Sequence, residues 1–274
     1  MKVDILSRLK AGGRYHQFCS EWGLPIEESP SVNLLEILRL WRDMRGLLLA
    51  DGDGTTISMR GYIHEYIFEA LSSLREHGHK TGLLTGKTRR QRGYSEGHYT
   101  YCAYCNGAFI TKDGVPIMAK FITNVAQLLD KLGAIVRPSE FQIVKEVFAG
   151  EEVVFEIKFP ARHNYPLDKI EHILADEPVY ICQASWVHIC PTNKRETREE
   201  IAEHSKANPA APCIYMGNDY SDICILDDTG VVGIVPLNSP SQVQKHAAFI
   251  CPEAAPNFSK NLLQLLNSIV IGGQ

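Results

Sequence analysis

The sequence predicts an α/β fold in which a parallel sheet carries helices on both faces. Three short apolar runs indicate strands buried on both sides, at residues 46–50, 81–84 and 212–216. Segments with apolar residues at helical spacing alternate with these runs, for example residues 62–77 and 195–204. Such alternation is typical of a parallel, Rossmann-like sheet, for which we expect about five or six strands.

The composition describes an ordinary globular protein and argues against several functional classes. The chain has 274 residues, of which 45% are hydrophobic and 22% charged, enough for one large domain or two modest ones. A formal net charge of −4 argues against a dedicated nucleic-acid binder. No apolar run approaches the roughly 18 residues of a membrane helix. The N-terminus shows no secretory signal and the eight cysteines are widely spread, so we expect reduced thiols and a cytoplasmic location.

The remaining predicted elements belong either to the core or to a middle segment with a different pattern of helices and strands. Further core elements are expected at residues 101–105, 231–235 and 248–251 (strands) and 258–270 (a helix), with a turn at residues 112–114. The middle segment resembles a small α+β module, with helices expected at 122–132, 139–148 and 167–174 and strands at 153–159 and 179–189. In the strand at 153–159 the apolar residues alternate with Glu156 and Lys158, which predicts that these two face the other way.

Three polar clusters directly follow the three apolar strands. Asp51 and Asp53 come after the first strand, Thr85 after the second, and Asn218 with Asp219 after the third. Ligands of open α/β sheets bind at the carboxyl ends of the strands. We therefore expect these side chains to meet at one edge of the sheet.

The residue types at this edge suit phosphoryl transfer. A carboxylate such as Asp51 can take a phosphoryl group as a nucleophile, and Asp53 can protonate the leaving oxygen and later deprotonate water. Thr85 and Lys194 offer a hydroxyl, a backbone N–H and a positive charge to phosphate oxygens. Two close carboxylates need a cation, and oxygen ligands favour Mg²⁺. Taken alone, residues 51–55 would also fit an acidic turn that closes a strand.

Four motifs in this order resemble those of the haloacid dehalogenase superfamily. They are Asp51-Gly52-Asp53-Gly54-Thr55, Thr85-Gly86-Lys87, Lys194 after Pro191-Thr192-Asn193, and Gly217-Asn218-Asp219-Tyr220-Ser221-Asp222. The long stretch between the second and third motifs resembles the second type of cap domain. That cap occurs in phosphatases of sucrose phosphate, trehalose phosphate and mannosyl-phosphoglycerate, and Asn106-Gly107-Ala108 is also similar to that branch.

The resemblance implies a division of the chain and a role for each motif. Residues 1–45 would form an N-terminal helical extension, 46–116 and 186–274 the catalytic core, and 117–185 an inserted cap. Asp51 would be the nucleophile and Asp53 the acid/base. The phosphoryl group would be held by Thr85, Gly86 and Lys194, and Mg²⁺ by Asp51, Asp53, Asn218, Asp219 and Asp222.

The fourth motif departs from the pattern Gly-Asp-x-x-Asn-Asp of this branch. Asn218 stands in place of the first Asp, and Ser221 in place of the Asn. An Asn oxygen can ligate Mg²⁺ but carries no charge. A non-catalytic, ligand-binding relative is therefore one alternative to a phosphatase. A phosphomutase or phosphotransferase with the same nucleophile is the other.

The resemblance implies a small phosphorylated metabolite, most simply a sugar phosphate, with neither nucleic acid nor a membrane as partner. The candidates for substrate contacts are Lys87, Glu156, Lys158, Arg162 and His163. For each of them an ordinary exposed side chain is the alternative interpretation. The first 45 residues contain an amphipathic helix around residues 34–41, for which packing on the core, covering the site and building a homodimer face all remain open.

Overall fold

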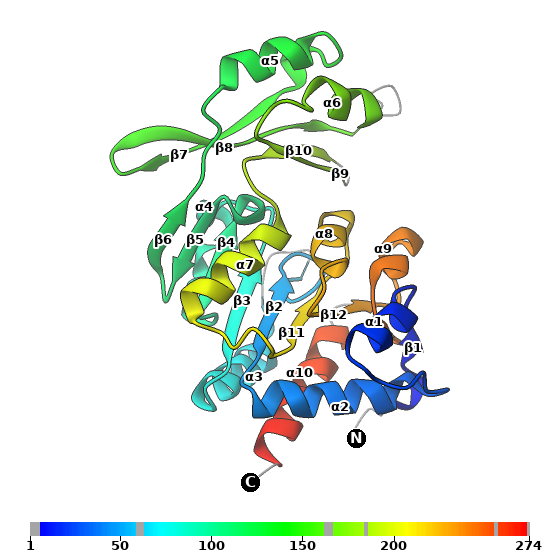
Figure 1. The fold of residues 1–274 in the computed structure, drawn as a ribbon. Coiled ribbons are helices and arrows are strands. Elements are labelled where there is room, and N and C mark those ends of the chain that lie inside the picture. The colour runs from blue at the N-terminus through cyan, green and yellow to red at the C-terminus, as the bar shows by residue number, and fades with distance from the viewer. Residues whose placement is uncertain (1–5, 59–62, 162–166, 184–185, 255–256, 273–274) are drawn as a thin grey trace.

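The computed structural model describes residues 6–58, 63–161, 167–183, 186–254 and 257–272 (Figure 1). A nine-stranded sheet forms the core, and a four-stranded sheet forms a cap above it. Within the described ranges, no helix combines the length and the apolar character that crossing a membrane requires.

The core sheet confirms the predicted parallel, Rossmann-like arrangement. Its strand order is β1-β13-β12-β11-β2-β3-β4-β5-β6. The central strands run parallel: β2 (Leu47–Asp51), β3 (Lys80–Leu84), β4 (Tyr101–Tyr104), β11 (Cys213–Met216), β12 (Val231–Pro236) and β13 (Phe249–Cys251). Antiparallel strands flank them: β1 (Lys10–Ala11) at one edge, and β5 (Phe109–Lys112) with β6 (Val115–Ala119) at the other. Every residue of the central strand β2 is buried, which explains its unbroken apolar sequence.

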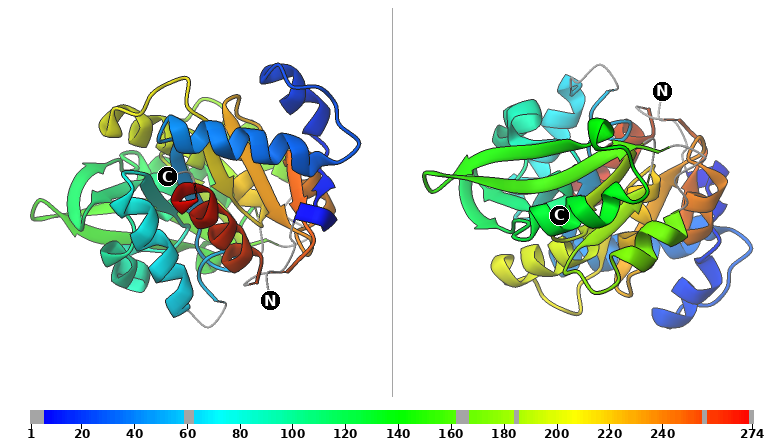
Figure 2. Two further views of the ribbon diagram at one scale, coloured as in Figure 1. Left: turned by 90° about the horizontal axis from the view of Figure 1, so that it is seen from below. Right: turned by 90° about the horizontal axis from the view of Figure 1, so that it is seen from above.

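Alternating side chains of these strands supply two apolar layers, one on each face. Leu48 and Ala50 belong to a layer with α1 (Tyr15–Glu21), α2 (Pro30–Asp43), α3 (Glu65–Glu76) and α10 (Asn257–Ile271), of which α2, α3 and α10 are seen from below in Figure 2. Leu47 and Leu49 belong to the opposite layer, with α7 (Lys194–Ser205), α8 (Ile223–Leu226) and α9 (Ser241–His246). The short helix α4 (Arg89–Arg92) follows β3.

The N-terminal segment packs on the core. Strand β1 pairs with β13, so that Lys10 lies opposite Ile250. Helix α2 buries one side in the apolar layer below the sheet, and its Trp41 is fully buried. The indole Nε1 of Trp41 donates a hydrogen bond to the Leu47 carbonyl at 2.9 Å, at the start of β2. Of the three roles left open by the sequence, the structure supports packing on the core.

The cap is an antiparallel sheet with helices on its outer face. Its order is β7-β8-β10-β9, formed by β7 (Gln142–Phe148), β8 (Glu151–Pro160), β10 (Trp186–Cys190) and β9 (Tyr180–Gln183). Helices α5 (Val125–Gly133) and α6 (Leu167–Ile173) lie on the side away from the core, as Figure 1 shows. The other face of the cap sheet is directed toward the carboxyl edge of the core sheet.

The predicted helix at residues 139–148 is wrong, because this segment contains strand β7. It pairs with β8 through a two-residue turn in which Ala149 and Gly150 both have positive φ, 53° and 90°. The predicted strand at 179–189 is in fact two strands, β9 and β10, that pair with each other. Both errors have the same cause, since a local apolar pattern does not reveal which partner a strand will find.

The chain passes from the core sheet to the cap sheet, and back again, a few residues later than expected. Strand β6 remains in the core sheet as far as Ala119, and β10 belongs to the cap sheet as far as Cys190. The changes therefore fall after residues 119 and 190, whereas the sequence placed them after residues 116 and 185. Sequence spacing cannot distinguish a strand that joins one sheet from a strand that joins the other.

Candidate active site

Asp51 is the last residue of β2 and lies at the carboxyl edge of the core sheet, where only 7% of it is exposed. Its strand neighbour is β3, and Asp51 pairs in register with Leu84, one residue before Thr85. A Cβ atom added to Gly52 would lie 3.2 Å from the Thr85 hydroxyl. The first two motifs are thus in close contact, as their positions after neighbouring strands predicted.

Lys194 brings the third motif into the same place. It is the first residue of α7, whose N-cap Asn193 accepts a hydrogen bond from the Glu196 N–H at 3.0 Å. The ammonium group of Lys194 is buried and lies 2.6 Å from Asp51 Oδ1 and 2.5 Å from Asp222 Oδ1. One buried cation therefore links the first motif to the fourth.

Asp222 is fully buried and both of its oxygens accept hydrogen bonds from the protein. Oδ1 accepts from Lys194 and from the Tyr215 hydroxyl at 2.6 Å. Oδ2 accepts from the backbone N–H groups of Asn218 and Asp219, at 2.8 and 2.9 Å. These contacts hold Lys194 and shape the loop of the fourth motif. The sequence suggested Asp222 as a metal ligand; in this structure its carboxylate contacts Lys194, Tyr215 and two backbone N–H groups.

Burial and neighbouring charges shift the pKa values of Asp51 and Lys194 in opposite directions. Burial raises the pKa of Asp51 to about 7, although the neighbouring Lys194 acts to lower it. Burial alone would lower the pKa of Lys194, but the carboxylates of Asp222 and Asp51 outweigh it, and the pKa is raised. Lys194 therefore stays charged, and the ionised form of Asp51 depends on that charge.

Asn218 and Asp219, in the same motif, make different hydrogen bonds. The side-chain oxygen of Asn218 accepts a hydrogen bond from the Thr55 hydroxyl at 3.0 Å, which joins the fourth motif to the first. The carboxylate of Asp219 caps a short 3₁₀ helix by accepting from the Tyr220 N–H at 2.7 Å. Asn218 thus presents an oriented oxygen at the sheet edge, while Asp219 has a structural task.

Arg92 contacts the site in a way that the sequence did not predict. Its guanidinium Nη2 lies 2.5 Å from Asp53 Oδ1, and both side chains are largely buried. Arg92 ends helix α4, so the segment after β3 reaches back to the first motif. The only signal for this contact in the sequence was the closeness of Arg92 to Thr85.

In the cap, a β-bulge changes the expected alternation of strand β8. Val144 pairs with Glu156 and Lys145 with Val154, so Phe155 is an extra residue. Phe155 accordingly packs in the apolar layer that includes Phe109 of the core sheet, whereas Ile157 and Phe159 pack beneath the cap helices. The prediction that these three residues share one face is therefore wrong.

The substrate candidates in the cap differ in their surroundings. Glu156 is 1% exposed; its Oε1 lies 2.5 Å from His188 Nδ1, and Lys158 Nζ lies 3.9 Å from its Oε2. Lys87, in the core, is exposed. Arg162 and His163 lie outside the described residues.

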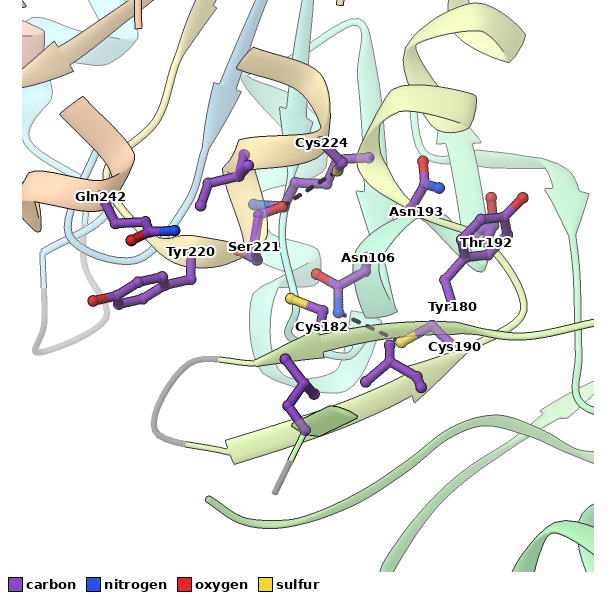
Figure 3. Close-up of a pocket in the computed structure, with 14 residues that line it drawn as sticks. Asn106, Tyr180, Cys182, Cys190, Thr192, Asn193, Tyr220, Ser221, Cys224 and Gln242 are labelled. Atoms are coloured by element: carbon purple, nitrogen blue, oxygen red, sulfur yellow. Dashed lines mark hydrogen bonds between the residues drawn. The ribbon is translucent and has the colours of Figure 1, made fainter. Parts of the chain in front are cut away.

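A cavity of about 710 Å³ opens between the cap and the core beside Lys194 (Figure 3). Asn106, Asn193, Ser221 and Cys224 line it from the core, and Tyr180, Cys182 and Cys190 from the cap strands. Its size is in the range of small-molecule sites in proteins. The described lining places hydroxyl, amide and thiol groups next to the ammonium group that binds Asp51.

The oxygen atoms at the sheet edge fit Mg²⁺ by chemical type but are few. Asp51 offers a carboxylate and Asn218 an amide oxygen at the same edge. Across the described residues, no group of three or more His, Cys, Asp and Glu side chains is arranged to hold a metal ion. A cation here would therefore depend on carbonyl and amide oxygens and on water for its remaining ligands.

Comparison with known proteins shows which sequences and structures this chain resembles. Residues 48–158 match the model of the haloacid dehalogenase-like hydrolase family. No curated protein sequence matches the chain significantly. Among solved structures, a haloacid dehalogenase subclass IIB sugar phosphatase is 14% identical with a TM-score of 0.64, and covers 82% of this chain and 99% of its own.

Two further solved structures agree with that fold. A phosphatase of the same superfamily from Bacteroides thetaiotaomicron is 18% identical with a TM-score of 0.64, covering 90% of this chain and 98% of its own. A haloacid dehalogenase-like hydrolase from B. subtilis is 12% identical with a TM-score of 0.66, covering 80% and 98%. The family match over residues 48–158 and the shared fold with its cap make this chain similar to haloacid dehalogenase-like hydrolases.

Proposed function

We propose that this protein is a phosphatase that hydrolyses a small phosphomonoester through a phosphoaspartate on Asp51. The observation that best supports the proposal is the buried ammonium group of Lys194, 2.6 Å from Asp51 and 2.5 Å from Asp222. A fixed positive charge beside a nucleophilic carboxylate stabilises the charge that collects on a phosphoryl group in transfer. Thr85 follows strand β3 beside the first motif, and its hydroxyl supplies a hydrogen-bond donor.

The proposed reaction has two displacement steps at phosphorus. In the first, an Asp51 carboxylate oxygen forms a bond to phosphorus while the bond from phosphorus to the leaving oxygen breaks. Asp53 gives its proton to that oxygen, and the product alcohol leaves. In the second, Asp53 takes a proton from water, the water oxygen bonds to phosphorus, and the bond to Asp51 breaks. Inorganic phosphate leaves and both carboxyl groups return to their starting states.

Asp53 must leave the contact seen here in order to act. Its carboxylate is held by Arg92 at 2.5 Å, so the ion pair has to open, or turn, before Asp53 reaches a leaving oxygen. Arg92 is therefore a positioning residue for the acid/base.

Mg²⁺ is the cofactor that the donor types favour. We assign its protein ligands to Asp51, the Asp53 carbonyl oxygen and Asn218, with Asp219 as a further candidate. A bound Mg²⁺ would offset the charge of the two carboxylates and of the phosphoryl oxygens. Asp222 has no free oxygen for this purpose while it holds Lys194.

A sugar phosphate is the substrate class that we favour. One similar structure is a sugar phosphatase, and the cavity beside Lys194 carries amide and hydroxyl groups suited to a hydroxylated leaving group. Cap strands line one side of this cavity, and a cap closed over the substrate would exclude bulk water during transfer.

The test replaces the nucleophile by its neutral isostere. With Mg²⁺ and 4-nitrophenyl phosphate, Asp51→Asn should lower phosphate release by about 1,000-fold or more, because an amide cannot form the phosphoaspartate. Its thermal unfolding should stay close to that of the wild type, since Lys194 keeps Asp222. The control is Asp227→Asn, at an exposed pair with His246, which should retain full activity.

Three outcomes would contradict the proposal. Full activity of Asp51→Asn would remove Asp51 from the reaction. An isomerised sugar phosphate without free phosphate would make the protein a mutase. Absence of turnover by the wild-type protein across a broad panel of phosphomonoesters with Mg²⁺ would make it a binding protein, the reading that Asn218 in the fourth motif leaves open.

A further inference from the structure

Asn106 lies over the phosphate-binding loop and has no role in the reaction described above. It follows β4 at the carboxyl edge of the sheet and has a left-handed backbone conformation, with φ at 57°. Its backbone N–H donates to the Thr85 carbonyl at 2.9 Å. A Cβ atom added to Gly86 would come within 3.4 Å of the Asn106 side-chain oxygen. The Asn106 amide is thus fixed directly above the second motif.

The side chain of Asn106 has only a weak partner. Its Nδ2 donates to Cys190 Sγ, in cap strand β10, at 3.5 Å, and sulfur is a poor hydrogen-bond acceptor (Figure 3). Cys190 is itself buried and directs its thiol toward Glu156 Oε1 at 3.8 Å. Asn106 therefore joins the core to the cap through a contact that an oxygen acceptor would replace with a gain in energy.

The position of this contact decides what could replace it. Asn106, Cys190 and Lys194 all line the cavity between cap and core. A phosphoryl group beside Lys194 and Thr85 would place its leaving group in this cavity, in front of the Asn106 amide. The amide is neutral and offers both donors and an acceptor, which suits a hydroxyl group better than a charged group.

We propose that Asn106 determines specificity by hydrogen-bonding a hydroxyl of the leaving alcohol, in place of its contact with Cys190. The inference rests on the proposed phosphatase activity and makes it more specific. The preferred substrates are phosphomonoesters of polyhydroxy alcohols with a hydroxyl group close to the ester. Alkyl phosphates of the same length without hydroxyl groups are poor substrates.

The experiment compares two substrates of equal chain length. For the wild-type protein with Mg²⁺, kcat/KM for sorbitol 6-phosphate should exceed kcat/KM for n-hexyl phosphate, with 4-nitrophenyl phosphate as a hydroxyl-free reference. In Asn106→Gly, which keeps the left-handed backbone but lacks the amide, the ratio of sorbitol 6-phosphate to 4-nitrophenyl phosphate should fall at least tenfold. Asn106→Asp, which lacks the donor, should lower the same ratio.

The matched control is Asn124→Gly, at an exposed residue whose side chain makes no capping hydrogen bond. Its ratio should equal that of the wild type. An unchanged ratio in Asn106→Gly, or a wild-type protein that prefers n-hexyl phosphate, would overturn the role of Asn106. Because 4-nitrophenyl phosphate is still hydrolysed in either case, that result differs from a failure of the phosphatase proposal, in which no phosphate is released from any substrate.

Discussion

At the scale of single residues, two side chains of the fourth motif make different contacts: the buried carboxylate of Asp222 and the amide of Asn218 at the sheet edge. Asp222 holds Lys194, Tyr215 and two backbone N–H groups, so it fixes the positive charge beside Asp51. Asn218 directs its oxygen to the sheet edge by accepting from Thr55. The sequence located both residues at this edge, but it could not assign the tasks, because these depend on which partners each oxygen meets.

The buried contacts of Asp222 predict a large effect on stability. Asp222→Ala should lower the free energy of unfolding by about 3 kcal/mol or more, since it leaves the buried Lys194 with Asp51 alone and two backbone N–H groups without an acceptor. Urea unfolding followed by circular dichroism measures this. Asp227→Ala, at an exposed ion pair, should change stability by less than about 1 kcal/mol. Equal effects of the two substitutions would contradict the prediction.

Replacing Asn218 by Asp is expected to raise the affinity of the protein for Mg²⁺. Asn218→Asp adds a negative charge where the branch pattern has an Asp, so Mg²⁺ should bind several-fold more tightly. The shift in melting temperature with increasing Mg²⁺ measures this without any substrate, and activity against Mg²⁺ concentration provides a second reading. An equal Mg²⁺ response in the variant and the wild type would place the metal away from Asn218. The control is Asn208→Asp, on the loop that precedes β11.

At the scale of the elements, the N-terminal helix and the core sheet share a buried histidine that gives stability a pH dependence. The ring of His79, just before β3, stacks on Trp41 of α2 with centroids 4.0 Å apart. Its Nδ1 lies 3.4 Å from the Gly46 carbonyl oxygen. Burial lowers the pKa of His79 from 6.5 to about 4. The folded state therefore keeps this ring neutral under conditions in which the unfolded chain protonates it.

The sign of the effect follows from proton binding. Between about pH 6.5 and pH 4 the unfolded state binds the extra proton, so the free energy of unfolding falls as the pH is lowered through that window, by at most about 1.4 kcal/mol per pH unit. Urea unfolding of the wild type and of His79→Gln at pH 7.5 and pH 4.5 measures it. The variant lacks the stacking contact and should be less stable at pH 7.5, but the difference should narrow at pH 4.5. A constant difference would contradict this assignment.

At the scale of the whole molecule, Glu196 ties the cap to the helix that carries Lys194. Its carboxylate accepts from the hydroxyl of Tyr180 in strand β9, and from Thr192, in the returning linker, at 2.9 Å. Lys120, in the outgoing linker, lies 3.5 Å from the same carboxylate and also pairs with Glu200. Both linkers and one cap strand therefore meet on the first two turns of α7, the helix that begins with Lys194.

From this arrangement we expect a substitution that changes substrate affinity without changing the rate of the chemical step. Tyr180→Phe removes one contact that holds the cap on the core, so the closed state becomes less populated and the apparent affinity falls in proportion. KM for the best sugar phosphate should rise a few-fold while kcat stays within about twofold. Tyr101→Phe is the control, because the Tyr101 hydroxyl contacts His204, away from the cap. A fall in kcat with unchanged KM would show that Tyr180 acts on the chemical step.

The sequence by itself determined the Rossmann-like core and the edge where the site lies, because buried parallel strands leave continuous apolar runs and place the residues that follow them at one edge. Only the tertiary structure decided the pairing of Arg92 with Asp53, the hydrogen bonds of Asp222, and the membership of β7 and β10 in the cap sheet. The physical reason is the same in each case. These features depend on contacts between residues far apart in the chain, and local periodicity carries no information about such partners.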